Sequence, residues 1–213
     1  MAVNMQVNLG GLLMKNPVTT ASGTFASGHE YADFIDVGAL GAVTTKGVSL
    51  NGWAGNDAPR IAETPFGMLN SIGLQNPGVE VLKQRDLPWL KDQNATVIVN
   101  VSGHSLDEYA AVVDSLEESN EVDAYELNIS CPNVDCGGMT FGTDPTMAAS
   151  VVAECRKRTK RPLIVKLTPN VTDITEIAKA VEDAGADAVS LINTLLGLSL
   201  IHISEPTRRV VIS

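Results

Sequence analysis

The chain has 213 residues, of which 44% are hydrophobic and 4% aromatic, and it carries a formal net charge of -10. That composition is typical of a soluble α/β domain with one sizeable core. The acidic charge excludes nucleic acid and anionic membrane surfaces as partners, because both bind clustered Lys and Arg side chains. The chain has no run of about 18 apolar residues and no signal-peptide pattern. We therefore expect a cytoplasmic protein without a membrane span.

The predicted elements form an alternating series. After a polar–apolar opening at residues 3–14, apolar β-branched runs alternate with helical patterns, which indicates βα units around a parallel sheet. The predicted strands cover residues 18–21, 42–45, 96–101, 124–129, 163–167 and 188–192. The predicted helices cover residues 29–34, 78–90, 106–118, 145–157 and 173–183. Asp144 before Pro145 has the form of a helix cap followed by a first-turn proline.

Two features depart from this regular series. The loop at residues 49–76 is rich in Gly, Pro and Asn and is too long for a simple connector, so we expect it to be functional. Residues 198–208, "LSLIHISEPTR", resemble the in-frame translation of a transposon-type sequencing adapter. We expect residues 198–213 to be a non-native tail, with an ordinary irregular C-terminus as the alternative, and exclude His202 and Arg208 from chemical reasoning.

Both a doubly wound sheet and a (β/α)8 TIM barrel consist of alternating βα units. No glycine-rich GxGxxG follows the first predicted strand, as a dinucleotide-binding sheet would require. A barrel needs eight strands and about 250 residues. We therefore predict an α/β fold in which residues 1–197 form an incomplete (β/α)8 TIM barrel, with about six of its eight βα units.

Polar residues stand at the C-terminal end of every predicted strand, which is where a parallel barrel has its active site. They include two lysines and three asparagines. A single lysine there is explained by a side chain that reaches out to water. The set predicts instead a site for an anionic, planar ligand, because amides match imide edges and lysines offset negative charge. The residues in question are Lys46, Asn100, Asn128, Lys166 and Asn193.

The three cysteines have different expected roles, which depend on their positions in the sequence. Cys131, Cys136 and Cys155 are an odd number without a secretion signal, and the three histidines are scattered, so we expect no disulfide framework, zinc site or iron–sulfur cluster in this chain. Cys131 follows a strand end and precedes the loop that contains Gly138, which favours catalysis over an inert role. We expect Cys136 and Cys155 to be inert.

Several long motifs occur in order along the chain: "ASGTF", "TTKGVSL", "GMLNSIGLQNPG", "NISCPN", "FGTDP", "VKLTPNVTDI" and "INTLLG". Through them the chain resembles the class 1 dihydroorotate dehydrogenases, most closely the type B catalytic subunit, from about Val7 to Gly197. The resemblance implies an FMN-dependent barrel enzyme that oxidises dihydroorotate to orotate in pyrimidine (UMP) biosynthesis. Cys131 would take the C5 proton while hydride passes from C6 to the flavin.

The resemblance also implies site residues. The expected FMN contacts are Ser22, Thr45, Lys46, Asn100, Asn128, Lys166 and Ile192. The expected substrate contacts are Lys46, Asn70, Ser71, Ile72, Gly73, Leu74, Asn128, Asn133, Asn193 and Thr194. Lys166 would stabilise negative charge on the flavin. Residues 134–143 would form a lid with hinges at Gly137, Gly138 and Gly142.

Type B relatives work with a second subunit that carries FAD and a [2Fe-2S] cluster and passes electrons to NAD, in a heterotetramer with a homodimer core. Asn193-Thr194 favours type B. The glycine-rich phosphate loops of the family do not follow Gly197, so we expect this chain alone to fold poorly and to retain little FMN.

Three alternatives remain open at this point. The flavin domain of dihydropyrimidine dehydrogenase has a similar cysteine loop but usually carries histidine where this chain has Asn133. A Schiff-base aldolase would use Lys166 as its nucleophile. The third alternative is an inactive truncated fragment.

Overall fold

A curved parallel sheet forms the centre of the molecule. The structure is a computed structural model that describes residues 3–65, 67–130 and 141–196. Its five parallel strands pair in the order β3-β6-β7-β8-β9. They are β3 (Val43–Thr44), β6 (Val97–Val101), β7 (Ala124–Asn128), β8 (Leu163–Leu167) and β9 (Ala188–Leu191). The predictions for strands at 42–45, 96–101, 124–129, 163–167 and 188–192 are confirmed to within two residues at each end.

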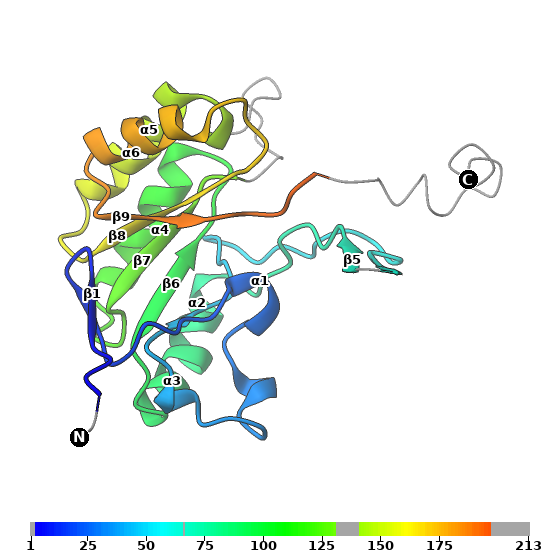
Figure 1. Cartoon of the computed structure of the whole chain (residues 1–213), viewed down its shortest axis with the longest axis vertical. Coiled ribbons are helices and arrows are strands. Elements are labelled where there is room, and N and C mark those ends of the chain that lie inside the picture. The colour runs from blue at the N-terminus through cyan, green and yellow to red at the C-terminus, as the bar shows by residue number, and fades with distance from the viewer. Residues whose placement is uncertain (1–2, 66, 131–140, 197–213) are drawn as a thin grey trace.

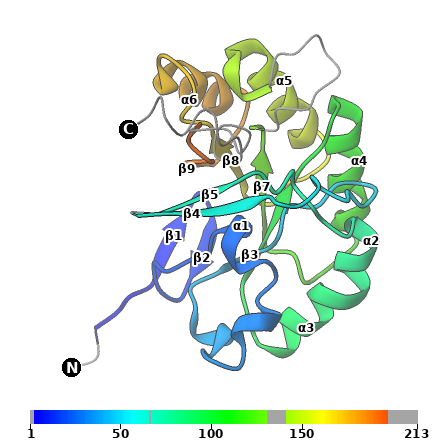
Figure 2. The same ribbon diagram turned by 90° about the vertical axis from the view of Figure 1, so that its right-hand side faces the viewer.

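Helices cover the outer face of this sheet (Figure 1; Figure 2). Three predicted helices are confirmed to within one residue: α4 (Leu106–Glu117), α5 (Pro145–Arg156) and α6 (Ile174–Asp183). The helix predicted at 78–90 is a continuous series of α2 (Val79–Val81), the π-helical η3 (Leu82–Asp86) and α3 (Leu87–Asp92). The arrangement is an α/β fold of the TIM-barrel type, in which successive parallel strands are neighbours.

Polar caps fix where the long helices begin. The Asp144 side chain accepts a hydrogen bond from the backbone N–H of Met147 at 2.9 Å, which confirms the predicted cap of α5. Ser105 accepts from the N–H of Glu108 at 3.2 Å and so caps α4. Each cap satisfies a backbone donor that has no partner within the helix.

The first predicted strand and helix are wrong in part. Residues 18–21 form only an isolated parallel bridge, Thr19 with Ala42, and Thr20 contacts the Thr44 backbone through its side-chain hydroxyl in place of a ladder bond; α1 (Ser22–Phe25) begins directly afterwards. Residues 29–34 contain only a 3-10 turn, η1 (His29–Tyr31), followed by a second at η2 (Val37–Ala39). The opening residues form the antiparallel hairpin β1 (Val7–Leu9) and β2 (Leu12–Met14).

The predicted long loop contains a hairpin of its own. Strands β4 (Ile61–Thr64) and β5 (Gly67–Asn70) pair in antiparallel register and project from the body of the molecule (Figure 1). A bridge between Trp53 and Asn76 closes the base of the segment. The segment is therefore an ordered excursion from the sheet.

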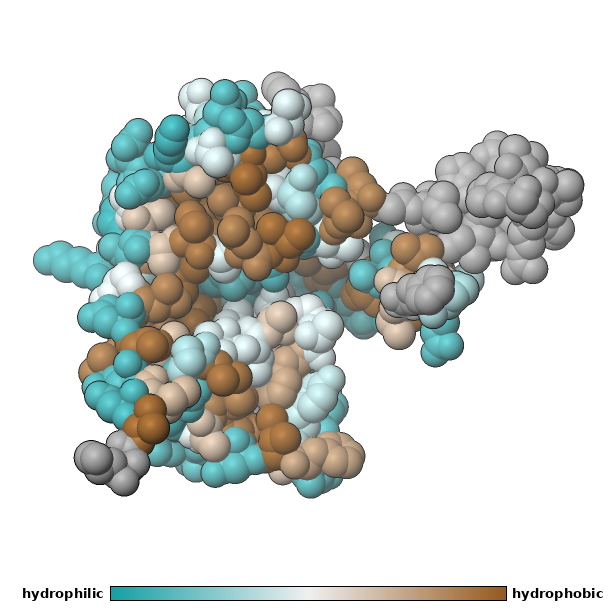
Figure 3. All heavy atoms as spheres, in the orientation of Figure 1, coloured by the Kyte–Doolittle hydropathy of each residue, from teal (hydrophilic) through white to brown (hydrophobic). Residues whose placement is uncertain are grey.

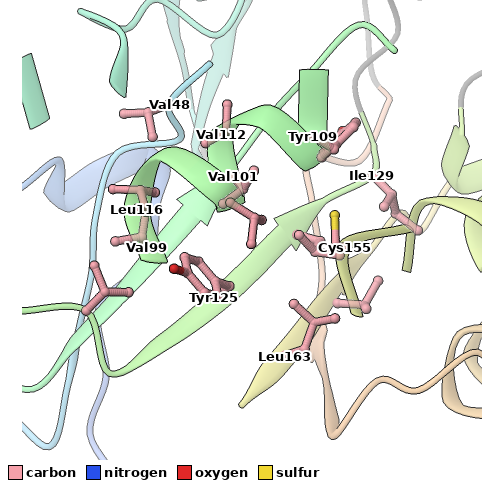
Figure 4. Close-up of a cluster of buried hydrophobic side chains, with 14 of the residues drawn as sticks. Val48, Val99, Val101, Tyr109, Val112, Leu116, Tyr125, Ile129, Cys155 and Leu163 are labelled. Atoms are coloured by element: carbon pink, nitrogen blue, oxygen red, sulfur yellow. The ribbon is translucent and has the colours of Figure 1, made fainter. Parts of the chain in front are cut away.

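The main hydrophobic core lies between the sheet and its helices. Val99, Val101 and Tyr125 from the strands pack with Tyr109 and Cys155 from the helices (Figure 4). Cys155 is fully buried in this core, and burial raises the pKa of its thiol to about 12, which agrees with the expected inert role.

The opposite face of the sheet has a second, smaller apolar layer. It contains Ile98, Ala124 and Ile164 from three adjacent strands, covered by Leu12 and Met14 of the β1–β2 hairpin. This layer closes the N-terminal end of the sheet interior, so that the C-terminal end is the side on which polar residues gather.

No helix among the described residues is long and apolar enough to cross a membrane. Over the same ranges, no three His, Cys, Asp or Glu side chains converge as metal ligands. The division into residues 1–197 and a tail at 198–213 stays a prediction, because the tail lies outside the described residues.

Candidate active site

The carboxyl ends of the parallel strands bring half of the predicted site residues to one edge. Asn128 is the last residue of β7, whereas Asn100 and Lys166 are the last but one of β6 and β8. Asn128 is directly opposite Lys166 in the β7–β8 register. Thr45 and Lys46 follow β3, and Ile192, Asn193 and Thr194 follow β9.

Asn100 is a fully buried side chain at the centre of this edge. Its backbone N–H donates to Thr45 Oγ1 at 3.3 Å, and its side-chain Nδ2 donates to Glu126 Oε1 at 3.0 Å. Its Oδ1 atom is buried and has no hydrogen-bond partner within the described part of the chain. A Cβ atom at Gly47 would lie 2.5 Å from that oxygen, so the backbone at residue 47 approaches Asn100 more closely than a side chain permits.

Two predicted substrate residues contact each other directly. Asn193 Nδ2 donates to Asn128 Oδ1 at 2.8 Å, and the backbone N–H of Thr194 donates to Asn193 Oδ1 at 2.7 Å. The backbone carbonyl of Asn128 accepts from the Tyr109 hydroxyl at 2.6 Å. The Asn128 backbone is thus tied to α4, and the Asn128 carboxamide is paired with that of Asn193.

The predicted lysines lie within electrostatic reach of one another. Burial lowers the pKa of Lys46, and the positive charges of Lys166 and Arg60 lower it further. Lys166 Nζ is 3.9 Å from Glu126 Oε1. The edge therefore concentrates positive charge, as a site for an anionic ligand requires.

Only part of the predicted substrate segment from Asn70 to Leu74 lies near the strand-end residues. Ile72 borders the same cavity of about 520 Å³ as Lys46 and Trp53. Gly73 and Leu74 have left-handed backbone conformations, with φ of 71° and 51°, which turn the chain back toward the sheet. Asn70 is exposed and pairs with Ile61 in the hairpin, and Ser71 donates its N–H to the Arg60 carbonyl at 2.8 Å.

Two other predicted flavin contacts, Ser22 and Ile192, differ in how far they are buried. Ser22 is buried at the start of α1, whereas Ile192 remains half exposed beyond β9. Cys131 and Asn133 lie outside the described residues, as do Cys136, Gly137 and Gly138 of the predicted lid. Gly142 of that lid is described and is buried within η4 (Phe141–Thr143).

Sequence reasoning missed Glu126 and Arg60. Glu126 stands two residues before Asn128 in β7, so the two side chains share a face of the sheet. An acidic residue inside an otherwise apolar strand was a signal for a buried polar partner. Arg60 gave no such signal, because it lies in the irregular segment before β4.

The fold is a parallel α/β fold of the TIM-barrel type, and enzymes of this class have their active sites at the C-terminal ends of the strands, where the lysines and amides of this chain lie. DHODH from Eimeria tenella, solved in complex with ferulenol, shares this fold with a TM-score of 0.75 at 20% sequence identity. The alignment covers 97% of this chain and 63% of that one.

The sequence comparisons identify the family. The sequence model for dihydroorotate dehydrogenase matches residues 4–209. The chain is 56% identical over 205 residues to dihydroorotate dehydrogenase B (NAD(+)), catalytic subunit, of Alkaliphilus metalliredigens, which covers 96% of this chain and 68% of the relative. It is 59% identical over 198 residues to the protein of the same name from Lachnoclostridium phytofermentans, covering 93% and 66%.

The chain belongs to the dihydroorotate dehydrogenase family. This confirms the resemblance drawn from its motifs, including the likeness to type B catalytic subunits. The chain spans about two thirds of the length of these curated relatives.

Proposed function

We propose that this chain, when loaded with FMN, catalyses the oxidation of dihydroorotate to orotate, a step of de novo pyrimidine biosynthesis in the cytoplasm. The observation that carries the proposal is the convergence of Lys46, Lys166, Asn128 and Asn193 at the C-terminal edge of the sheet, in a member of this family. Family membership also favours dihydroorotate over the dihydropyrimidine dehydrogenase and aldolase alternatives.

The residues present fit FMN. A flavin ring presents both hydrogen-bond donors and acceptors and becomes negatively charged when reduced. The edge offers the Lys46 and Lys166 ammonium groups, together with buried polar atoms such as Asn100 Oδ1 and Ser190 Oγ that have no partner among the described residues. An unpaired buried polar group costs about 1–3 kcal/mol, so a ligand that approaches such atoms with donors would stabilise the site.

Bound FMN would supply the acceptor for the hydride that leaves C6 of dihydroorotate. We assign Ser22, Thr45, Asn100, Asn128 and Ile192 to holding the flavin, with Lys46 and Lys166 placing positive charge beside it. The proposed substrate contacts are Lys46, Asn70, Ser71, Ile72, Gly73, Leu74, Asn128, Asn133, Asn193 and Thr194.

Cys131 is the proposed base that removes the proton from C5 of dihydroorotate. In the sequence it stands three residues after Asn128, the last residue of β7. A thiolate beside lysine side chains is stabilised by their charge and can accept a proton near neutral pH.

The relatives are named catalytic subunits of NAD(+)-dependent enzymes. We therefore propose that electrons leave this chain through a partner subunit with FAD and a [2Fe-2S] cluster and pass to NAD, in a heterotetramer with a homodimer core.

Replacement of the base tests the proposal. Orotate formation from dihydroorotate, measured with an artificial electron acceptor, should fall about 10²–10⁴-fold in Cys131→Ala, which is the usual contribution of a positioned general base. Cys155→Ala is the matched control, because it removes a core thiol remote from the strand ends and should leave turnover per bound FMN unchanged. Wild-type turnover in Cys131→Ala would contradict the assignment.

A further inference from the structure

We propose that Glu126 is the positioning residue of this site: its carboxylate fixes the orientation of the Asn100 amide and balances the charge of Lys166. Through that balance it sets how strongly the site favours the reduced, negatively charged cofactor. The inference rests on the proposed function, because it concerns the same FMN site.

Glu126 occupies the middle of a polar layer that crosses three strands. It lies on β7 opposite Asn100 of β6, and Lys166 of β8 approaches it from the other side. Each of the three residues follows by two positions a member of the apolar layer formed by Ile98, Ala124 and Ile164. Because side chains alternate along a strand, this polar layer stands directly on the apolar one, on the inner face of the sheet.

The contacts converge on one carboxylate oxygen. Glu126 Oε1 accepts from Asn100 Nδ2 at 3.0 Å and lies 3.9 Å from Lys166 Nζ. Only 7% of the Glu126 surface is exposed. Burial raises the pKa of Glu126, and the Lys166 charge and the Asn100 hydrogen bond oppose that increase.

Packing alone does not explain a carboxylate at this position. The adjacent layer is filled by aliphatic side chains, and a buried ion pair is often no more stabilising than apolar residues of the same volume. A buried acid that contacts two proposed cofactor residues is better explained by what it does to those residues.

The first effect is on the orientation of Asn100. A carboxylate accepts hydrogen bonds, so the amide must turn Nδ2 toward Glu126 and Oδ1 away from it. That oxygen then faces the backbone at Gly47, next to Lys46, where it remains unpartnered within the described chain. Glu126 thus orients the Asn100 amide so that its Oδ1 atom, a hydrogen-bond acceptor, faces the site.

The second effect is on charge. Lys46, Lys166 and Arg60 lie close enough for the pKa of Lys46 to be lowered by the other two. Among the described residues, Glu126 is the acid that lies within 4 Å of the Lys166 ammonium group. Removing its charge would leave Lys166 unbalanced beside the cofactor.

The test is the midpoint potential of bound FMN in the purified, FMN-loaded enzyme. Glu126→Gln keeps the shape and an oxygen acceptor for Asn100 but removes the charge. We expect its FMN potential to shift to more positive values, because an unbalanced Lys166 favours the negatively charged reduced form. Glu121→Gln is the matched control, since it removes the same charge from the surface pair with Lys91, and its potential should equal that of the wild type.

Glu126→Asp serves as a second variant if Glu126→Gln does not fold. It keeps the charge but withdraws it by one methylene, so a smaller shift in the same direction is expected. A merely structural role would lower stability in these variants without moving the potential. The inference would be overturned if the FMN potential of Glu126→Gln equals that of Glu121→Gln. If only Glu126→Asp folds, the same comparison is made with that variant.

Failure of this inference can be distinguished from failure of the proposed function. If the wild-type enzyme binds no FMN, or if dihydroorotate does not reduce its FMN, the proposed function fails and the inference falls with it. If the wild-type enzyme passes both tests and the Glu126 variants keep the wild-type potential, only the inference fails.

Discussion

At the scale of single residues, the site combines groups that the sequence identified with two that it did not, Glu126 and Arg60. Lys46, Asn128 and Lys166 were predictable because each ends or follows a parallel strand, and strand ends converge. Glu126 was not identified, because its partners come from neighbouring strands whose register the sequence does not state. The roles of Cys131 and Asn133 stay predictions.

Asp86 gives a pH-dependent prediction at this scale. Its side chain is almost fully buried and accepts hydrogen bonds from Arg85 Nε at 2.6 Å and Ser27 Oγ at 2.9 Å, with His29 Nε2 at 3.1 Å. Burial alone would raise the pKa of Asp86, but the bonds from Arg85, Ser27 and His29 outweigh it and lower the pKa below its usual value. Its carboxylate therefore stabilises the fold when ionised.

Because the folded-state pKa is lowered, this stabilisation is complete above the unfolded pKa of about 3.9 and is lost as pH falls through the folded value. We expect Asp86→Asn to reduce the free energy of unfolding by about 1.5–3 kcal/mol at pH 7. The deficit should stay constant down to about pH 5 and shrink below about pH 4. Urea unfolding at pH 7 and pH 3 measures it, and an equal deficit at both would contradict this account.

At the scale of elements, the buried strands could be predicted from the sequence, whereas the exposed hairpin could not. The strands β6 and β7 are buried throughout and β8 is buried except at Lys166, so each appeared as a short run rich in apolar residues. The hairpin β4–β5 is largely exposed, with Ile61 and Met68 more than half accessible, and has no apolar pattern from which to predict it. The hairpin at residues 7–14 was missed because each of its strands has only three residues, too few to show a pattern.

The cap of α5 provides a prediction at the element scale. Asp144→Ala removes the acceptor for the Met147 N–H and should lower the free energy of unfolding by about 1 kcal/mol, within the usual range of about 0.5–2 kcal/mol. Asp144→Ser supplies another capping oxygen and should recover most of the loss. Denaturant unfolding of the three proteins measures both changes, and equal stability of Ala and wild type would show that the cap contributes nothing.

At the scale of the whole molecule, the β9 edge of the parallel sheet exposes several apolar side chains. Leu191 and Ile192 are 67% and 49% accessible, and Val189 of the same strand is 41% accessible. Figure 3 shows hydrophobic side chains gathered on the face where β9 lies. An open strand with apolar side chains is a template for pairing with another chain.

We therefore expect this 213-residue chain to self-associate when it is produced alone. Leu191→Lys should reduce the association, because a charged side chain on an open edge opposes strand pairing. Sedimentation velocity at several concentrations measures the mass distribution. Lys91→Glu is the control, because it changes a surface charge away from that edge and should leave the association unchanged. A monomeric wild-type chain at all concentrations would contradict this prediction.

The central claim is that this site removes a proton and a hydride from dihydroorotate. The most direct measurement is the visible flavin absorbance of the FMN-loaded protein when dihydroorotate is added without oxygen. The account predicts rapid bleaching that yields one orotate per flavin in the wild type, and bleaching that is slower by orders of magnitude in Cys131→Ala. Flavin absorbance that stays unchanged in the wild-type protein would contradict it.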